Sequence, residues 1–407
     1  MKVMHRRCAG LDVHSEQIVA AIRVSRGRAV EEETRSFSAT TGGLVGLRDW
    51  LESFQVTHVA MEATGVYWKP VWHVLDGGFD LVLVNALHVR NVPGRKSDVS
   101  DAGWLASLLA HGLVRSSFVP PQPIQELRDL TRTRKQLTRE VVQHAQRIQR
   151  TLEDANIKLT ETISNVLGTS GRAMLQAIVA GESDPTRLAE LAHPRLRASR
   201  ESLVEALRGR LTEHHRFLIG LHLRQVDALQ AEIAVIESRI KERIEPFRGQ
   251  LELLVTIPGV STTVAQAIIA EIGVDMTRFP TAGHLISWAG LCPRMDESAG
   301  KRRSTRIRKG APWLKTMLVQ SAWCAARTKD SYFRAQFLRL KSRRGPKKAA
   351  IAVAASILTA AYFMLERDQS YHDLGIEHFQ SRDKQALVTR LAARIRSLGY
   401  SVEVRAA

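Results

Sequence analysis

The chain has few cysteines, and they are scattered. Cys8, Cys292 and Cys324 lie far apart in the sequence and form no CxxC pair. This spacing argues against a zinc site and against a disulfide framework, and it is typical of a protein in a reducing cytoplasm.

Long apolar segments are also scarce. Residues 1–7 carry charge but no apolar core of the kind that a signal peptide has. The longest apolar stretch, residues 349–364, is shorter than the roughly 20 residues that span a bilayer. We therefore expect a buried helix in this stretch, a cytoplasmic protein and no membrane partner.

Acidic residues are outnumbered by basic ones. The 407 residues include 59 Lys and Arg but only 41 Asp and Glu, which gives a formal net charge of +18. Such an excess is typical of proteins that bind nucleic acid, and less often of those that bind acidic membranes. The length predicts two or three domains.

Four acidic residues follow an ordered arrangement in the first quarter of the chain. Asp12 lies in the apolar run 8–13, Glu62 ends the run 58–62, and Asp98 and Asp101 follow shortly after. A carboxylate in a buried strand is costly unless it is paired or binds a cation. Carboxylates are preferred ligands of Mg²⁺, and paired metal ions promote phosphoryl chemistry. We therefore predict a divalent-metal site that acts on a phosphodiester.

Each of these residues also has a simpler explanation. Asp98 and Asp101, three apart on a predicted helix, share a face, but acidic residues in a first turn also complement the helix dipole. Asp12 could be an ordinary strand-end residue, and Glu62 could pair with a surface arginine. The occurrence of all four in this order favours the metal site.

Five neighbouring residues fit the predicted site more loosely. His14 could line it or belong to a turn. Tyr67 and Trp68 could stack on a base or pack in the core. Arg95 and Lys96 could contact a phosphate near the metals or be solvated ahead of the helix.

The order of elements predicts a mixed α/β domain over residues 1–119. We expect strands at 8–13, 18–24, 29–37, 56–62 and 81–85, with a helix at about 41–54. Ser97 is a candidate N-cap for a further helix over 98–111. Hairpin strands followed by alternating helices and strands imply a mixed sheet with helices packed on it, which matches the ribonuclease H-like fold.

The proline-rich residues 120–123 mark a domain boundary. Helical periodicity over 124–159 and 203–244, with a less regular segment at 160–200 between them, predicts a second domain over residues 120–248. A coiled-coil arm and an ordinary helical bundle both explain this pattern.

Residues 249–370 predict a mostly helical third domain, and residues 371–407 a polar tail. Ile257-Pro-Gly-Val260 before a helix at 262–272 is typical of a helix-hairpin-helix element, whose turn offers backbone N–H groups to a phosphate. Ser261 stands where a second glycine is usual, and this weakens the match.

A polar, basic loop is predicted over residues 294–310, with Ser298 at its start. A serine hydroxyl becomes a nucleophile when its alkoxide is stabilised and the phosphate charge is neutralised. Chemistry alone favours a turn role for Ser298, and Ser287 and Ser304 are equal candidates. Polyanion binding is predicted for the basic residues of this loop, Lys301, Arg302, Arg303, Arg306, Arg308 and Lys309.

Several motifs resemble those of insertion sequence family 110 transposases. They comprise Gly10–His14, Met61–Gly65 and Lys96–Asp101, followed by 257–259, 288–293, 298–300 and 308–314. The resemblance implies a RuvC-like first domain in which Asp12, Glu62, Asp98 and Asp101 bind Mg²⁺, with Mn²⁺ possible. It also implies that Ser298, in a second catalytic domain, forms a covalent 5′-phosphoserine link to DNA.

The resemblance further implies several partners. A structured guide (bridge) RNA would pair with donor and target DNA, and the active site would combine residues from different subunits of a homodimer or homotetramer. The sequence contains no base-reading module, which agrees with sequence choice by base pairing. We therefore expect a bacterial, nucleoid-associated recombinase. The alternatives are a metal-dependent resolvase-like nuclease without a covalent intermediate and a non-catalytic packaging protein.

Overall fold

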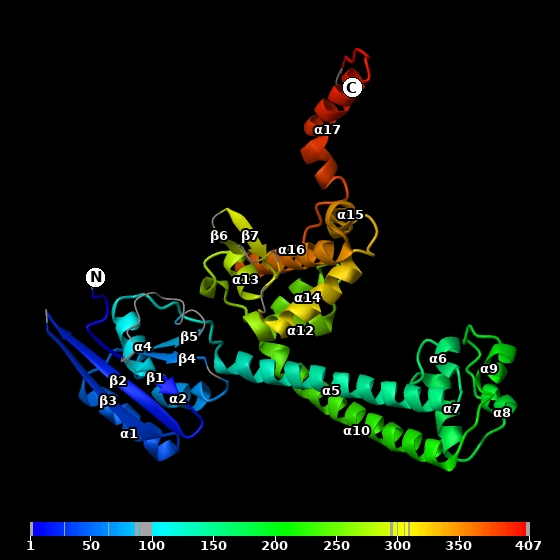
Figure 1. The fold of residues 1–407 in the computed structure, drawn as a ribbon, viewed down its shortest axis with the longest axis horizontal. Coiled ribbons are helices and arrows are strands. Elements are labelled where there is room, and N and C mark those ends of the chain that lie inside the picture. The colour runs from blue at the N-terminus through cyan, green and yellow to red at the C-terminus, as the bar shows by residue number, and fades with distance from the viewer. Residues whose placement is uncertain are drawn as a thin grey trace. The chain divides into compact units, whose positions relative to one another are not determined.

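The computed structural model describes residues 3–27, 29–63, 65–85, 89, 100–293, 296–298, 300–304, 306–307 and 310–403. The chain divides into two compact units, Met1–Val119 and Pro120–Ala407 (Figure 1), which are described separately. The four-domain organisation predicted from the sequence stays a prediction.

A five-stranded mixed sheet forms the centre of the first unit. Its strands are β1 (Arg7–Val13), β2 (Gln17–Arg26), β3 (Ala29–Ser38), β4 (His58–Glu62) and β5 (Asp80–Val84), and their order is β3-β2-β1-β4-β5. The three N-terminal strands pair antiparallel, whereas β1–β4 and β4–β5 pair parallel. A mixed sheet followed by a mostly helical region is consistent with the predicted ribonuclease H-like fold.

Helices cover both faces of this sheet (Figure 1). Because side chains alternate along a strand, Leu11 and Met61 join a core on one face with α1 (Thr41–Ser53) and α2 (Trp68–Leu75). Cys8 and Ala60 point to the opposite face, where they pack with Leu105 of α4 (Asp101–Ala110).

The start of α4 differs from the prediction. The helix begins at Asp101, and the hydroxyl of Ser100 accepts the N–H of Gly103 at 3.1 Å. Ser100 has a ψ angle of 152°, which is not helical, so it is the N-cap in place of Ser97. The predicted start of this helix at Asp98 is therefore wrong, because α4 begins at Asp101. Ser97 and Asp98 themselves lie outside the described residues.

Two long antiparallel helices open the second unit. They are α5 (Gln122–Asp154) and α10 (Glu213–Ile244), and they lie side by side (Figure 1). Ion pairs join the start of one to the end of the other: Glu126 lies 3.3 Å from Arg243, and Asp154 lies 2.9 Å from His215. This geometry accounts for the helical periodicity of both segments.

The segment between the long helices is more ordered than predicted. It forms α6 (Leu159–Thr162), α7 (Thr169–Val179), α8 (Pro185–Glu190) and α9 (Arg200–Ala206), which share a core with the adjoining ends of α5 and α10. The predicted continuous helix from residue 203 to 244 is wrong. Gly209 comes so close to Ala155 that an added Cβ would lie 2.3 Å from its carbonyl oxygen, and Thr212 then caps a new helix.

The rest of the second unit is mostly helical. Its elements are the 3-10 turns η1 (Glu245–Phe247) and η2 (Met276–Arg278), the hairpin β6 (Asp296–Ser298) and β7 (Lys301–Ser304), and the helices α11 (Arg248–Val255), α12 (Thr262–Ile272), α13 (Ala282–Trp288), α14 (Pro312–Ala325), α15 (Tyr332–Arg344), α16 (Pro346–Arg367) and α17 (His378–Ser397).

Helix α16 contains the apolar stretch noted in the sequence. Among the described residues it alone is long and apolar enough to cross a membrane. It packs against α13, α14 and α15, and Val353, Ile357 and Leu358 are fully buried. The helix is therefore part of the core, as predicted.

Two other segments hold more regular structure than expected. Residues 294–310, predicted as a loop, contain the hairpin β6–β7, and the tail predicted over 371–407 contains α17. In the hairpin, Ser298 pairs with Lys301, and Gly300 between them has a φ angle of +72°. A glycine adopts this conformation at little cost, which allows the tight turn.

Candidate active site

Asp12 and Glu62 lie at the same edge of the sheet. In the parallel pair β1–β4, Leu11 is opposite Met61, and the two carboxylate residues follow one position later on each strand. Neighbouring strands are about 4.8 Å apart, and opposite residues share a face. The sheet thus brings together two acidic residues that are 50 positions apart in the sequence.

Gly10 allows α4, which begins at Asp101, to lie close to β1. A Cβ at Gly10 would lie 2.2 Å from the carbonyl oxygen of Ala102 and 2.5 Å from the N of Ala106. Only a glycine lets the first turn of α4 come this close to β1. Because Asp101 immediately precedes Ala102, it begins α4 on the sheet face that Asp12 and Glu62 share.

The immediate surroundings of Asp12 are polar. Its side chain is 28% exposed, and its Oδ2 lies 3.2 Å from Nε2 of His14. His14 lies in the turn after β1, where its N–H donates to the carbonyl of Gln17, so it is both a turn residue and a neighbour of the carboxylate.

The structure does not bring the predicted ligand set together in full. Within the described ranges, no three His, Cys, Asp or Glu side chains are close enough to hold one metal ion. Asp98, Arg95 and Lys96 lie outside those ranges. Carboxylate oxygens are suitable donors for Mg²⁺, and Asp12 and Glu62 supply two such donors in register.

The two aromatic candidates have different environments. Trp68 packs against the sheet core and lies edge-on to Trp72, with 5.9 Å between ring centroids. Tyr67 is 46% exposed. Core packing therefore accounts for Trp68, and Tyr67 remains accessible.

Ser298 ends β6 directly before the hairpin turn, and its side chain lies outside the described ones. The two competing serines have structural positions. The hydroxyl of Ser304 accepts the N–H of Arg306 at 3.2 Å, and Ser287 lies in the last turn of α13. The choice of Ser298 over these two serines stays a prediction.

The basic residues lie on the second strand of the hairpin and directly after it. Lys301 and Arg306 are exposed, and Arg302 and Arg303 belong to β7, although their side chains are outside the described ones. Arg308 and Lys309 lie outside the described residues.

The turn between α11 and α12 packs on one side against α14 and is exposed at Ser261. Gly259 has a φ angle of +84°, and an added Cβ would lie 2.5 Å from the carbonyl oxygen of Ser321 in α14. Ser261 is the N-cap of α12, because its hydroxyl accepts the N–H of Val264 at 3.4 Å. A capping role explains why a serine can replace the usual second glycine.

Gly10 belongs to the motif Gly10–His14, but the sequence did not predict its structural role. The available indication was a small residue two positions before a strand carboxylate, on the same face of the strand.

Two regions of the chain match known protein families. Residues 9–157 match a family model of the DEDD type that is described as transposase, and residues 251–338 match the transposase IS116/IS110/IS902 family. Over 328 residues the chain is 24% identical to the "Insertion element IS110 uncharacterized 43.6 kDa protein" of Streptomyces coelicolor. The aligned region covers 75% of this chain and 80% of the relative. The first match covers the sheet unit and continues through α5, and the second lies within the helical unit, in the order that the sequence motifs predict. The chain belongs to the IS110 family of transposases, enzymes that recombine DNA.

Proposed function

We propose that this transposase breaks and rejoins DNA through a covalent link to Ser298, with help from carboxylates that bind Mg²⁺ or Mn²⁺. Asp12, Glu62, Asp98 and Asp101 would hold the metal. The observation that carries the proposal is the register of Asp12 and Glu62 on β1 and β4, with α4 held against the same face by Gly10. Divalent ions at such a site activate an attacking oxygen and stabilise a leaving oxygen.

In the proposed reaction the hydroxyl of Ser298 attacks a DNA phosphorus. A bond forms between the serine oxygen and the 5′-phosphate, and the bond from that phosphorus to the 3′-oxygen breaks. The serine gives up its proton, and the leaving 3′-oxygen takes one. Since one phosphoester replaces another, a 3′-hydroxyl of a second strand can reverse the step and rejoin DNA.

Basic side chains near the hairpin would lower the cost of this step. Lys301 pairs with Ser298 across the turn, and Arg306 follows on the exposed side. Cations that face a phosphate stabilise the charge that develops during attack. Lys301, Arg302, Arg303, Arg306, Arg308 and Lys309 would supply them here, with Arg95 and Lys96 beside the carboxylates.

We further propose the partners that the family resemblance implies. A bridge RNA would pair with donor and target DNA, and α5 with α10 would act as a coiled-coil arm that joins subunits of a homodimer or homotetramer. The carboxylates of one subunit would then meet Ser298 of another. The helix-hairpin-helix element would contact DNA phosphates, and the protein would work at the bacterial nucleoid in the cytoplasm. The net charge of +18 supports binding of this much polyanion.

The covalent link separates the proposal from its main rival. We expect the wild type to form a protein–DNA adduct that resists denaturation, and Ser298→Ala to lose both the adduct and strand exchange. Ser304→Ala is the matched control and should retain both activities. Cleavage by Ser298→Ala without an adduct would favour a metal-dependent nuclease that uses water.

Nucleic acid that co-purifies with the protein tests the guide. Sequencing should recover one discrete RNA that contains segments complementary to donor and target sites. A collection of random fragments would contradict RNA guidance while leaving the serine chemistry open to its own test.

A further inference from the structure

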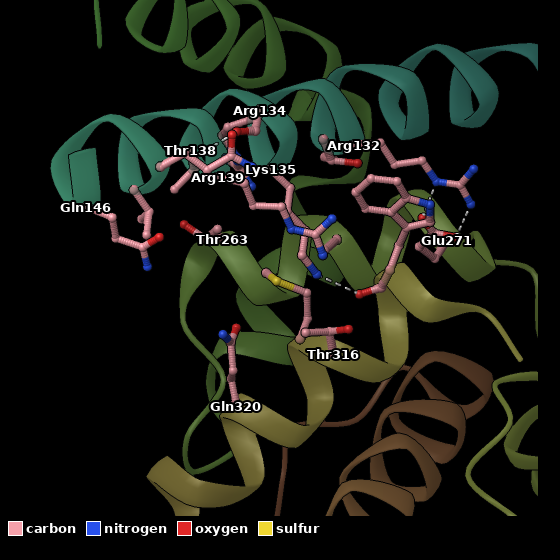
Figure 2. Close-up of a pocket in the computed structure, with 16 residues that line it drawn as sticks. Arg132, Arg134, Lys135, Thr138, Arg139, Gln146, Thr263, Glu271, Thr316 and Gln320 are labelled. Carbon is pink, nitrogen blue, oxygen red and sulfur yellow. Dashed lines mark hydrogen bonds and ion pairs between the residues drawn. The ribbon is translucent and has the colours of Figure 1, made fainter. Parts of the chain in front are cut away.

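Three helices of the second unit enclose a partly open groove that belongs neither to the sheet edge nor to the hairpin. Its volume is about 590 Å³, and its walls come from α5, α12 and α14 (Figure 2). This volume falls within the range of ligand-binding pockets, which is about 300–1,000 Å³.

The wall on α5 is a stripe of basic and polar side chains. Arg132, Lys135, Arg139 and Gln146 recur at spacings of three, four and seven residues, which places them on one helix face. At 1.5 Å per residue the stripe is about 21 Å long. A nucleic-acid strand of this length carries about six phosphates.

One acidic residue of the groove is already neutralised. Glu271 on α12 is 2% exposed, and both of its carboxylate oxygens accept hydrogen bonds from Arg132, at 2.7 and 2.8 Å. Arg128 adds a second cation 3.8 Å from the same carboxylate. The groove wall contains four cationic side chains and this single carboxylate, so it carries a net charge of three positive units.

Two cations face the groove with no carboxylate oxygen within 4.0 Å of either among the described residues. Figure 2 shows the side chains of Lys135 and Arg139 extending from α5 toward α12 and α14. Lys135 donates to the carbonyl oxygen of Trp313 at 3.2 Å, and the guanidinium of Arg139 lies 5.2 Å from the centroid of the Trp313 ring. Lys135 Nζ also lies 5.8 Å and the guanidinium of Arg132 5.7 Å from the same centroid, so the indole faces three cations.

The surroundings of Lys135 disfavour its charge. Burial lowers the pKa of Lys135, and the nearby Arg139 lowers it further. An anion in the groove would relieve this effect, because an opposite charge favours the charged form of lysine.

The remaining walls suit a nucleotide strand. Thr263 lies in the exposed first turn of α12, whose N-terminus favours negative charge. Ala267 and Met317 supply apolar surface on which a base or sugar can pack. The groove therefore combines fixed cations with apolar walls.

We propose that the groove between α5, α12 and α14 binds the phosphate backbone of a nucleic-acid strand, with Lys135 and Arg139 as its main contacts. This proposal rests on the proposed action of the chain on nucleic acid, but it requires neither the carboxylate metal site nor Ser298. The bound strand is part of the DNA substrate or of an RNA, and the two sources share this chemistry.

Binding without metal tests the groove separately from catalysis. Fluorescence anisotropy would use a short labelled DNA single strand, the matching RNA and the DNA duplex, with a chelator present. The full-length double variant Lys135→Gln/Arg139→Gln should bind at least one of these probes about tenfold more weakly. For this variant, the slope of log affinity against log salt concentration should be smaller in magnitude by about 1 to 2. The probe that loses most identifies the source of the strand.

A matched variant controls for the loss of two positive charges. Arg150→Gln/Arg224→Gln removes two exposed cations from α5 and α10 outside the groove and should bind nearly as the wild type does. Lys135→Arg/Arg139→Lys keeps the charges and should restore binding. Equal losses in the groove and control variants, or no loss in either, would overturn the proposal, provided that thermal unfolding shows all variants folded.

Discussion

The two units use acidic residues in opposite ways. In the sheet unit, the side chain of Asp12 is 28% exposed near the end of a strand, and its Oδ2 lies 3.2 Å from Nε2 of His14. In the helical unit, Glu271 is 2% exposed and both its oxygens are bound by Arg132. A carboxylate whose oxygens are both used holds helices together, whereas one at an accessible strand end is suited to bind a cation. The comparison predicts that mutations in the two units separate activity from stability.

The largest effect is expected at the sheet edge. Asp12→Asn should reduce DNA strand cleavage by about 10³-fold or more, because an amide is a much weaker metal ligand than a carboxylate. The free energy of unfolding should change by no more than about 0.5 kcal/mol. Cleavage assays and urea unfolding measure the two quantities.

Asp49→Asn is the matched control, since Asp49 is an exposed acidic residue on α1 of the same unit. It should keep wild-type cleavage. Full activity of Asp12→Asn would remove the distinction drawn between the units.

The next effect concerns stability in the helical unit. Glu271→Gln should lower the free energy of unfolding by roughly 3 kcal/mol, because it leaves Arg132 and Arg128 without their buried partner. This is near the low end for a buried pair, since the side chain of Arg132 is 34% exposed. Burial lowers the pKa of Arg128 to about 10, whereas the charge of Glu271 acts to raise it, so loss of this carboxylate would disfavour the charged guanidinium further. Urea unfolding measures the free energy of unfolding of Glu271→Gln and of the control Glu232→Gln, which changes an exposed residue of α10. Equal stability of the two variants would show that Glu271 does not stabilise the fold.

Gly10 connects stability with activity. Gly10→Ala places a Cβ against the backbone of α4 and should cost about 1–3 kcal/mol through overpacking. Because α4 then moves away from β1, cleavage should fall as well. Gly46→Ala on α1 is the matched control: its Cβ meets nothing within 4 Å, and a helical Gly→Ala change should stabilise the protein by about 0.5–1 kcal/mol.

The smallest effect is a pH dependence in the helix pair α5–α10. His144 and His222 face each other at 3.2 Å between their Nδ1 atoms, and Arg147 lies nearby. Burial lowers the pKa of both rings; Arg147 lowers that of His144 further, and His144 that of His222. Above about pH 7.5 both rings are almost entirely neutral in the folded and the unfolded chain, so they add almost no pH dependence. As the pH falls below this value, the unfolded chain takes up protons that the folded pair resists, and stability decreases.

Urea unfolding at pH 7.5 and 5.5 measures this effect. The wild type should lose more stability between the two pH values than His144→Gln does. Identical pH dependence in both proteins would show that the pair does not couple protonation to folding.

The sequence predicted the sheet unit well because its information is local. The apolar runs predicted the strands that hold Asp12 and Glu62, and the parallel pairing of β1 with β4 makes these two residues neighbours. The start of α4 was misplaced because Ser97 and Ser100 are both acceptable caps, and only backbone geometry selects Ser100. The basic groove was not foreseen. Lys135, Thr263 and Trp313 lie on three helices far apart in the chain, so no spacing rule brings them together.

The central claim is that the carboxylates near the N-terminus and the serine near the C-terminus act in one reaction. Mass spectrometry of the peptide that contains Ser298, after the protein has reacted with element-end DNA, its co-purifying RNA and Mg²⁺, tests this most directly. We predict a nucleotide attached to Ser298 in the wild type and none in Asp12→Asn. DNA cleavage with an unmodified Ser298, or a modified Ser298 in Asp12→Asn, would contradict the account.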